Sequence, residues 1–148
     1  MKIYIIRHGE TDMNRQGLFQ GQSNIALNSH GMEQASLLSF SLKDSKLDYI
    51  YSSPLDRAIQ TAKAINKYHN AEIIINKDII ERSLGELEGK KYSDLNLPDL
   101  WSHILNLNNI TDSSYGVETL QHMLDRAYNF LDMLIKKYKN IDANVLIS

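Results

Sequence analysis

The sequence predicts a three-layer α/β/α sandwich with a largely parallel central sheet. Short apolar runs rich in β-branched residues recur along the chain, and stretches with helical spacing separate them. Strands that alternate with helices are typical of βαβ units, in which parallel strands share one sheet and helices cover its faces. The 148 residues suffice for one domain with its own core. The sequence contains no repeat, low-complexity tract or linker, so we expect a single domain over residues 1–148.

Four apolar runs are predicted to form the strands. The first is residues 3–6, with four apolar and mostly β-branched residues in succession. Such a run indicates a strand buried on both faces, as in the centre of a parallel sheet. The other strands are expected at residues 49–51, 72–75 and 145–147.

Two stretches in the first half of the chain have the spacing of amphipathic helices. The first follows Asn28 or Ser29, either of which can cap it. Its apolar face is expected to be Met32, Ala35, Leu38 and Leu42. The second begins at residues 52–54, a serine cap followed by a proline, and runs to about residue 69.

The strongest helical pattern follows Glu118. Its apolar stripe, which is expected to face the core, is Leu120, Met123, Leu124, Ala127, Leu131, Leu134, Ile135 and Tyr138. One or two short helices are also expected within residues 93–107.

Composition and charge exclude several classes of function. The chain is 43% hydrophobic and 23% charged, with a formal net charge of -2, so neither nucleic acid nor an anionic membrane is expected as a partner. It contains no cysteine, which excludes disulfides and favours a cytoplasmic protein. Residues 3–6 are too short a run for a signal peptide, and no stretch approaches the length that spans a bilayer.

Arg7, His8 and Gly9 follow the first predicted strand directly. In open α/β sheets, ligands bind just outside the carboxyl ends of the strands. A cation, an imidazole and a glycine that allows close approach of the backbone therefore lie where a ligand is expected. The same residues also fit a strand that ends in a polar turn with a solvated histidine, and the pattern alone leaves both interpretations open.

Arg57 is a second candidate, because it falls in the first turn of the second predicted helix. The usual interpretation of such a residue is a solvated charge on a helix. An arginine is unfavourable at the positive end of a helix dipole unless an anion is nearby, which weakly favours a ligand and leaves both interpretations open. Residues 12–28 form a long polar loop, of a kind that is usually functional or disordered. Residues 81–89 form a second polar, turn-rich segment.

Several segments carry recognisable motifs. Arg7 to Thr11 reads RHGET beside an N-terminal strand, residues 52–62 read SSPLDRAIQTA, residues 81–89 read ERSLGELEG, and residues 116–120 read GVETL. In this order, they resemble the RHG, SSPLxRAxxTA, E-x-x-x-G-x-x-E-G and G-G-E-S segments of the histidine phosphatase (phosphoglycerate mutase-like) superfamily. Asn14 and residues 17–31 resemble the family's phosphate-side loop. The resemblance covers nearly the whole chain and implies a phosphoglycerate mutase-like fold.

The resemblance implies a role for each matched residue. His8 is the nucleophile that attacks phosphorus and forms a phosphohistidine, and Glu81 protonates the leaving group. Arg7 and Arg57 bind the phosphoryl group, and no metal or cofactor is implied. Further contacts to phosphate or substrate are expected from Asn14, Gln20, Gly21 and Ser23.

Charge and geometry fit these roles. A phosphate monoester carries nearly two negative charges, and a planar guanidinium group can bond two of its oxygens. Two nearby arginines also disfavour the imidazolium form of His8, and the nucleophile must be unprotonated. The carbonyl of Gly9 is a candidate to fix the tautomer of the ring.

The end of the chain departs from the family pattern. The family continues its last strand into a second histidine and a glycine, whereas this sequence ends at Ser148. We expect that the sequence is truncated there, and that this chain is much less active than a longer form. The other histidines match no catalytic position and are expected to be surface or packing residues: His30, His69, His103 and His122.

The expected function is a phosphomonoesterase that acts on a small phosphorylated metabolite, with a homodimer left open. The segment between Glu81 and Glu118 is short, whereas mutases of the family tend to carry longer insertions there. This favours a phosphatase over a cofactor-dependent phosphoglycerate mutase. A degenerate, non-catalytic phosphate-binding protein is the alternative from another class.

Overall fold

The computed structural model describes residues 1–95, 100 and 107–148, and a four-stranded parallel sheet lies at its centre. The strands are ordered β1-β4-β2-β3, and every pair is parallel. All four predicted strands are present, each within one or two residues of its expected position. Their bounds are β1 (Lys2–Ile5), β2 (Tyr49–Ser52), β3 (Glu72–Ile75) and β4 (Asn144–Ile147).

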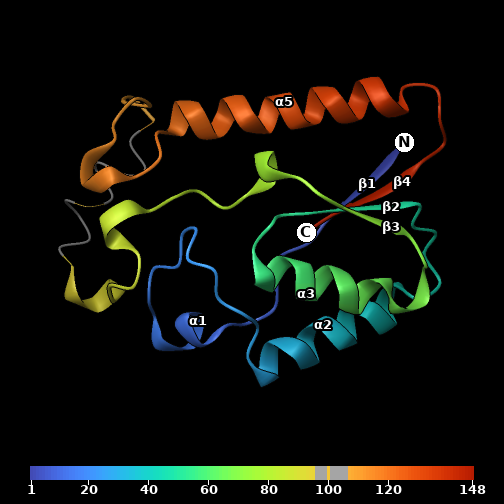
Figure 1. Ribbon diagram of the computed structural model, residues 1–148, viewed down its shortest axis with the longest axis horizontal. Helices are drawn as coiled ribbons and strands as arrows, with labels where there is room; N and C mark the ends of the chain where they lie inside the picture. Colours follow the sequence, from blue (N-terminus) through green and yellow to red (C-terminus); the bar gives the residue numbers. More distant parts are fainter. Residues whose placement is uncertain (96–99, 101–106) are drawn as a thin grey trace.

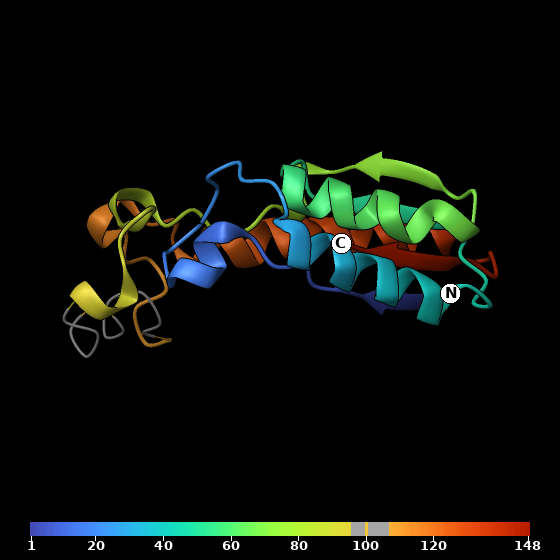
Figure 2. The same ribbon diagram turned by 90° about the horizontal axis from the view of Figure 1, so that it is seen from below.

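Helices cover the two faces of the sheet. In Figure 1, α5 (Leu120–Tyr138) lies on one side of the strands, and α2 (Ser29–Leu42) and α3 (Asp56–Ile65) lie together on the other. Figure 2 shows α2 and α3 side by side, with α5 behind the strands. The predicted three-layer α/β/α sandwich is confirmed. Within the described part of the chain, no helix has the length and apolar character needed to cross a membrane.

The alternation of side chains along the strands divides the core in two. Tyr51 and Val145 pack under α5 with Phe130 and Leu134. Their neighbours Ile50 and Leu146 pack on the opposite face, in a cluster that includes Ala62 and Ile65 of α3. A third cluster lies under the segment that follows β3 and contains Phe19, Leu87, Leu100 and Val117.

The first strand corrects one expectation. β1 is an edge strand of the described sheet rather than a central one. Tyr4 and Ile6 pack against the core on the α2–α3 side, whereas Ile3 is 37% and Ile5 79% exposed. The reason is strand order: β4 lies between β1 and β2, and the core beneath α5 is built over β2 and β4.

The apolar stripes of the helices are only partly buried. In α5, Leu120, Leu134 and Tyr138 are buried as predicted, but Leu124, Leu131 and Ile135 are 39%, 41% and 56% exposed, and Phe130, outside the predicted stripe, is buried. In α2, Ala35 is buried, Leu38 and Leu42 pack against the core, and Met32 is 43% exposed. The helical period was predicted correctly, but the face that meets the sheet is rotated from the predicted stripe.

The start of α3 lies later than predicted. Ser53 still takes part in the sheet, because its N–H donates to the carbonyl of Ser148 (2.9 Å). The helix therefore begins at Asp56, after a Leu55 cap that makes no side-chain bond, and it ends at Ile65 with a 3-10 turn beyond it. The cap of α2 was predicted correctly, since the side chain of Asn28 accepts from the N–H of Gly31.

The polar loop contains a helix that was not predicted. Thr11 and Asn14 form a capping box at the start of α1 (Asp12–Gln16), and Gly17 ends the helix in the left-handed conformation. The short helices expected around Pro98 and Trp101 fall largely outside the described residues.

Candidate active site

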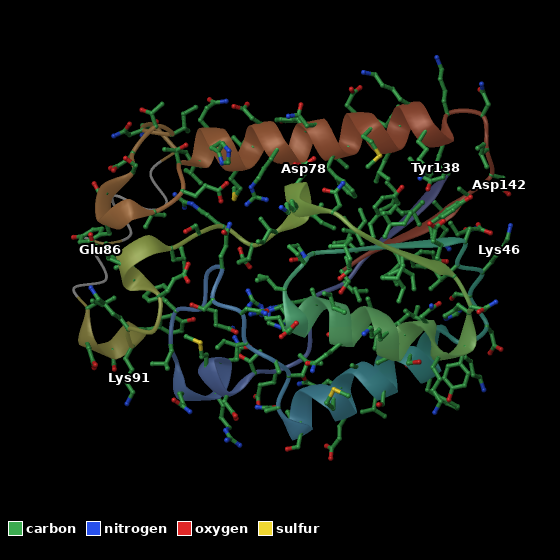
Figure 3. All side chains as sticks on the ribbon, viewed as in Figure 1. Lys46, Asp78, Glu86, Lys91, Tyr138 and Asp142 are labelled. Carbon is green, nitrogen blue, oxygen red and sulfur yellow. The ribbon has the colours of Figure 1, made fainter. Side chains whose placement is uncertain are left out.

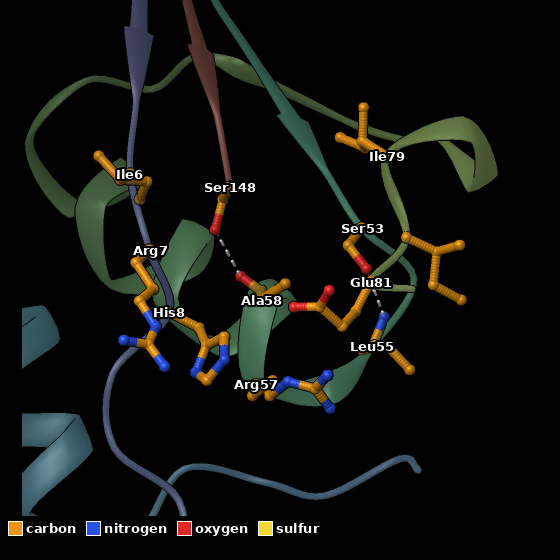
Figure 4. A pocket seen from close by; sticks show the side chains of 11 residues that line it. Ile6, Arg7, His8, Ser53, Leu55, Arg57, Ala58, Ile79, Glu81 and Ser148 are labelled. Atoms are coloured by element: carbon orange, nitrogen blue, oxygen red, sulfur yellow. Dashed lines mark hydrogen bonds between the residues drawn. The ribbon is translucent and has the colours of Figure 1, made fainter. Parts of the chain in front are cut away.

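A cavity of about 280 Å³ lies at the carboxyl ends of the strands (Figure 4). The segment after β1 contributes Arg7 and His8, the first turn of α3 contributes Arg57, and the segment after β3 contributes Glu81. These residues are far apart in the chain, and the parallel sheet brings them together because all its strands end at the same edge. The other residues that line the cavity are Ile6, Ser53, Leu55, Ala58, Ile79, Ile80 and Ser148.

His8 is oriented by its own neighbour. Its Nδ1 lies 2.6 Å from the carbonyl oxygen of Gly9; a carbonyl only accepts, so Nδ1 carries the proton and Nε2 keeps its lone pair. Burial lowers the pKa of His8, and the charges of Arg57 and Arg7 lower it further, against opposing contributions from the Gly9 bond and Glu81. At neutral pH the imidazole is therefore neutral, as a nucleophile requires.

Arg57 is almost completely buried, with 2% of its surface exposed. Its guanidinium donates to the carbonyl oxygens of Gly21 (2.7 Å) and Ser23 (2.8 Å). Burial lowers its pKa, and the negative charges of Glu81 and Glu88 oppose that shift. A guanidinium has five N–H donors, so these two bonds fix its plane and leave other donors for an oxyanion.

The other predicted phosphate ligands differ in whether they line a cavity together with His8. Asn14 lines a neighbouring cavity of about 460 Å³ with Arg7 and His8, so it lies near His8. The side chain of Gln20 instead accepts from Thr11 Oγ1, and that of Ser23 donates to Glu88. None of the three described cavities that include His8 is lined by Gln20, Gly21 or Ser23.

Glu88 forms hydrogen bonds that connect the loop bonded to the Arg57 guanidinium with the segment after β3. One carboxylate oxygen accepts from the N–H groups of Gln22 (2.9 Å) and Leu84 (3.0 Å), and the other accepts from Ser23 Oγ (2.7 Å). Burial alone would raise the pKa of Glu88, but these hydrogen bonds outweigh it and lower the pKa. Glu88 therefore stays charged and fixes the two carbonyls that orient Arg57.

Sequence reasoning missed several residues that support the site. Thr61 Oγ1 accepts from the N–H of Gly9 (3.2 Å) and donates to the carbonyl of Arg57 (2.8 Å). It therefore connects the backbone next to His8 with the backbone of Arg57. Thr61 falls within the SSPLDRAIQTA segment, and this motif was the sequence feature that could have indicated its role. The supporting role of Glu88 was signalled in the same way by ERSLGELEG. Among the described residues, no three His, Asp or Glu side chains come together as a metal site.

The parallel α/β/α sandwich brings a histidine, two arginines and a glutamate together at one edge of the sheet, an arrangement that suits the binding of a phosphate group. The sequence profile described as histidine phosphatase superfamily (branch 1) matches residues 3–148. The chain belongs to this superfamily, and the resemblance noted in its motifs is confirmed.

Relatives of known name are mainly phosphatases. The "Uncharacterized phosphatase PhoE" of Bacillus subtilis is 34% identical over 145 residues, which are 93% of this chain and 66% of that protein. The "Metal-independent phosphoserine phosphatase" of Arabidopsis thaliana is 33% identical over 142 residues, 93% of this chain and 60% of that protein. The chain thus spans about three fifths of the length of the curated relatives it matches.

A solved structure of another protein has the same fold as this chain. The alpha-ribazole phosphatase from Shigella flexneri superposes with a TM-score of 0.84 at 28% identity, and the alignment covers 100% of this chain and 73% of that one. The phosphoglycerate mutase-like architecture expected from the motifs is therefore confirmed.

Proposed function

We propose that the protein is a phosphomonoesterase that releases phosphate from a small phosphorylated metabolite through a phosphohistidine on His8. The observation that carries the proposal is the orientation of His8: its Nδ1 is bonded to Gly9, its pKa is lowered, and its ring lines one cavity with Arg7, Arg57 and Glu81. Relatives that are named as phosphatases support the same reaction class.

In the first step, Nε2 of His8 attacks phosphorus and the bond from phosphorus to the ester oxygen breaks. The leaving oxygen takes a proton from the carboxyl group of Glu81, so an alcohol departs. Arg7 and Arg57 neutralise the charge on the phosphoryl oxygens, which is the main contribution a protein makes to phosphoryl transfer.

In the second step, water attacks the phosphohistidine. The carboxylate of Glu81 takes the proton from this water, and the bond from phosphorus to Nε2 breaks. Phosphate leaves, His8 is again neutral, and Glu81 is again protonated, so the cycle closes without a metal or an external acid.

The test is to trap the intermediate. We expect p-nitrophenyl phosphate, followed by an alkaline quench, to add one phosphoryl group to the peptide that contains His8, detected by mass spectrometry. His8→Ala should lose both the label and phosphate release. His30→Ala, which changes an exposed histidine outside the cavities that include His8, is the matched control and should keep both. Turnover without a label on residue 8 would contradict the proposal.

Two further readouts separate the alternatives. Interconversion of 2- and 3-phosphoglycerate in the presence of bisphosphoglycerate, with little phosphate release, would indicate a mutase. Phosphate binding measured by calorimetry, with no label and no turnover, would indicate a non-catalytic phosphate-binding protein.

A further inference from the structure

The segment that carries Glu81 has little regular structure of its own. After β3 the chain forms a 3-10 turn, η2 (Lys77–Ile79), and then runs without helix or strand past Glu81 to a second short turn at Gly85–Leu87. Such a segment cannot fix a side chain by its own hydrogen-bond ladder. Contacts from other elements must hold Glu81 in place, and α5 packs against η2.

Two bonds reach Glu81 directly: Gln22 Nε2 donates to its carbonyl (2.9 Å), and the N–H of Arg82 donates to its carboxylate (2.9 Å). The rest of the segment is held by a largely buried ion pair between Glu118, just before α5, and Arg126 within it. The guanidinium of Arg126 binds the carboxylate of Glu118 with two bonds, Nε to Oε1 (2.7 Å) and Nη2 to Oε2 (2.9 Å). The two side chains are only 12% and 8% exposed. A bidentate pair of this kind is both strong and geometrically specific.

The pair forms hydrogen bonds with the backbone on both sides of Glu81. Before it, Nη1 of Arg126 donates to the carbonyl of Asp78 (2.8 Å), in the turn that Figure 3 shows beside α5. After it, the carboxylate of Glu118 accepts from the N–H of Ser83 (3.2 Å), and the N–H of Glu118 donates to the carbonyl of Ser83 (2.9 Å). The backbone that presents Glu81 is therefore attached to α5 at both ends.

The pair stays charged across the pH range of an enzyme assay. Burial alone would raise the pKa of Glu118, but hydrogen bonds from Arg126 and His122 outweigh it and lower the pKa to about 2. Arginine does not lose its proton in this range. Any change of activity with pH in the assay therefore arises from other groups.

We propose that Arg126 and Glu118 are positioning residues for the proton-donor carboxyl of Glu81. The inference rests on the proposed function, in which Glu81 protonates the leaving oxygen. Arg126 and Glu118 do not line the cavity that holds His8, although Arg126 lines a neighbouring cavity of about 320 Å³ together with Glu81. The positioning role rests on their bonds to the backbone at residues 78 and 83.

The test uses two substrates that differ in their need for an acid. Nitrophenolate leaves without a proton, whereas an alkoxide needs one, so a misplaced acid slows the first step far more for an alkyl phosphate than for p-nitrophenyl phosphate. The rate compared is that of the first step, read as the initial burst of alcohol or nitrophenolate, because Glu81 also serves as the base in the second step, which both substrates share. Glu81→Gln should slow the alkyl phosphate by about 10²–10⁴. Arg126→Met should slow it by up to about 10², with little change for p-nitrophenyl phosphate.

Two more variants complete the design. In Glu81→Gln combined with Arg126→Met, the second change should add no further loss, because the acid it positions is already gone. Lys136→Met breaks an exposed ion pair with Asp132 on the same helix and should leave both substrates unaffected. If Arg126→Met does not fold, Glu118→Gln, which keeps the shape of the side chain, carries the same comparison, with folding checked by circular dichroism.

The possible failures are distinguishable. If Glu81→Gln slows the first step equally for both substrates, the acid role fails, and the positioning inference fails with it. If Glu81→Gln discriminates between the substrates but Arg126→Met or Glu118→Gln slows both equally, or adds its loss to that of Glu81→Gln, the pair is only structural and the positioning inference alone is overturned.

Discussion

The two sides of the cavity are built by different means. On the nucleophile side, residues 7–9 continue β1 and are held mainly by backbone geometry: Gly9 lies against the backbone of Gly31 in α2 so closely that a Cβ on either glycine would overlap main-chain atoms. On the side of the proposed acid Glu81, the acid side, residues 77–88 are held by charged side chains that are at least partly buried: Glu88, and the pair of Glu118 with Arg126.

This difference determines what each side is sensitive to. Steric close packing does not depend on pH, but it tolerates no added atoms, because protein interiors are packed as densely as crystals. Buried charges tolerate small changes of shape, but their binding is lost when one partner is neutralised. The nucleophile side should therefore respond to added volume, and the acid side to loss of charge.

The largest effect is expected where the two sides are linked. Arg57 belongs to α3, but the carbonyls that orient it belong to a loop that Glu88 holds. In Arg57→Lys, a compact ammonium replaces a planar fork and cannot reproduce both bonds and bind phosphate as well. We expect turnover of p-nitrophenyl phosphate to fall by about 10²–10³. Arg15→Lys, at an exposed ion pair with Asp12, is the matched control, and equal rates for the two variants would remove Arg57 from the mechanism.

On the acid side, stability should fall at low pH through Glu118. Its folded pKa of about 2 lies below its ordinary value of 4.5, so its contribution is complete above pH 4.5 and is lost as the pH falls toward 2. Linkage gives about 3 kcal/mol as the upper size of that contribution. Urea unfolding between pH 2 and 7 should show a stability difference between wild type and Glu118→Gln that disappears at the acid end. A difference independent of pH would contradict the assignment.

On the nucleophile side, the smallest effect follows from one added methyl group. Gly31→Ala should gain up to about 1 kcal/mol of helix propensity but lose about 1–3 kcal/mol to overlap with the backbone of Glu10. We expect a modest net loss of stability together with reduced turnover, because Glu10 lies two residues from His8. Gly89→Ala is the control: φ of +83° strains alanine there, but nothing lies within 4 Å of its Cβ. It should lose stability while keeping turnover, and a fully active Gly31→Ala would show that this close contact does not position His8.

Much of the fold and the central residues of the site could be predicted from local pattern. The strands were placed within one or two residues, because β-branched runs between helical stretches reflect the backbone geometry of each element. The meeting of Arg7, His8, Arg57 and Glu81 in one cavity was also predicted. The ends of parallel strands indicated Arg7, His8 and Arg57, whereas Glu81 was indicated only by the resemblance of its motif to the superfamily. The catalytic roles of these residues remain predictions that the experiments above address.

Other features could not be predicted because they depend on partners distant in sequence. Nothing in residues 3–6 indicates that β4, about 140 residues later, lies between β1 and β2. The resemblance suggests Gln20 and Ser23 as phosphate ligands, and these roles stay predictions. The sequence did not indicate that their side chains bond to Thr11 and Glu88. A polar side chain in a loop carries no local signal for whether its partner is a ligand or another part of the chain.

The sequence by itself determined which stretches form strands and helices, and that the reacting groups follow strands or begin a helix, because periodicity and motif spacing are local properties of the backbone. Only the tertiary structure decided the strand order, the face of α5 that meets the sheet, and the pairing of Glu118 and Arg126 around the segment of Glu81. These features depend on which apolar surfaces, distant in the sequence, pack against each other, and on which charged side chains form ion pairs. Both are determined only when the whole chain folds.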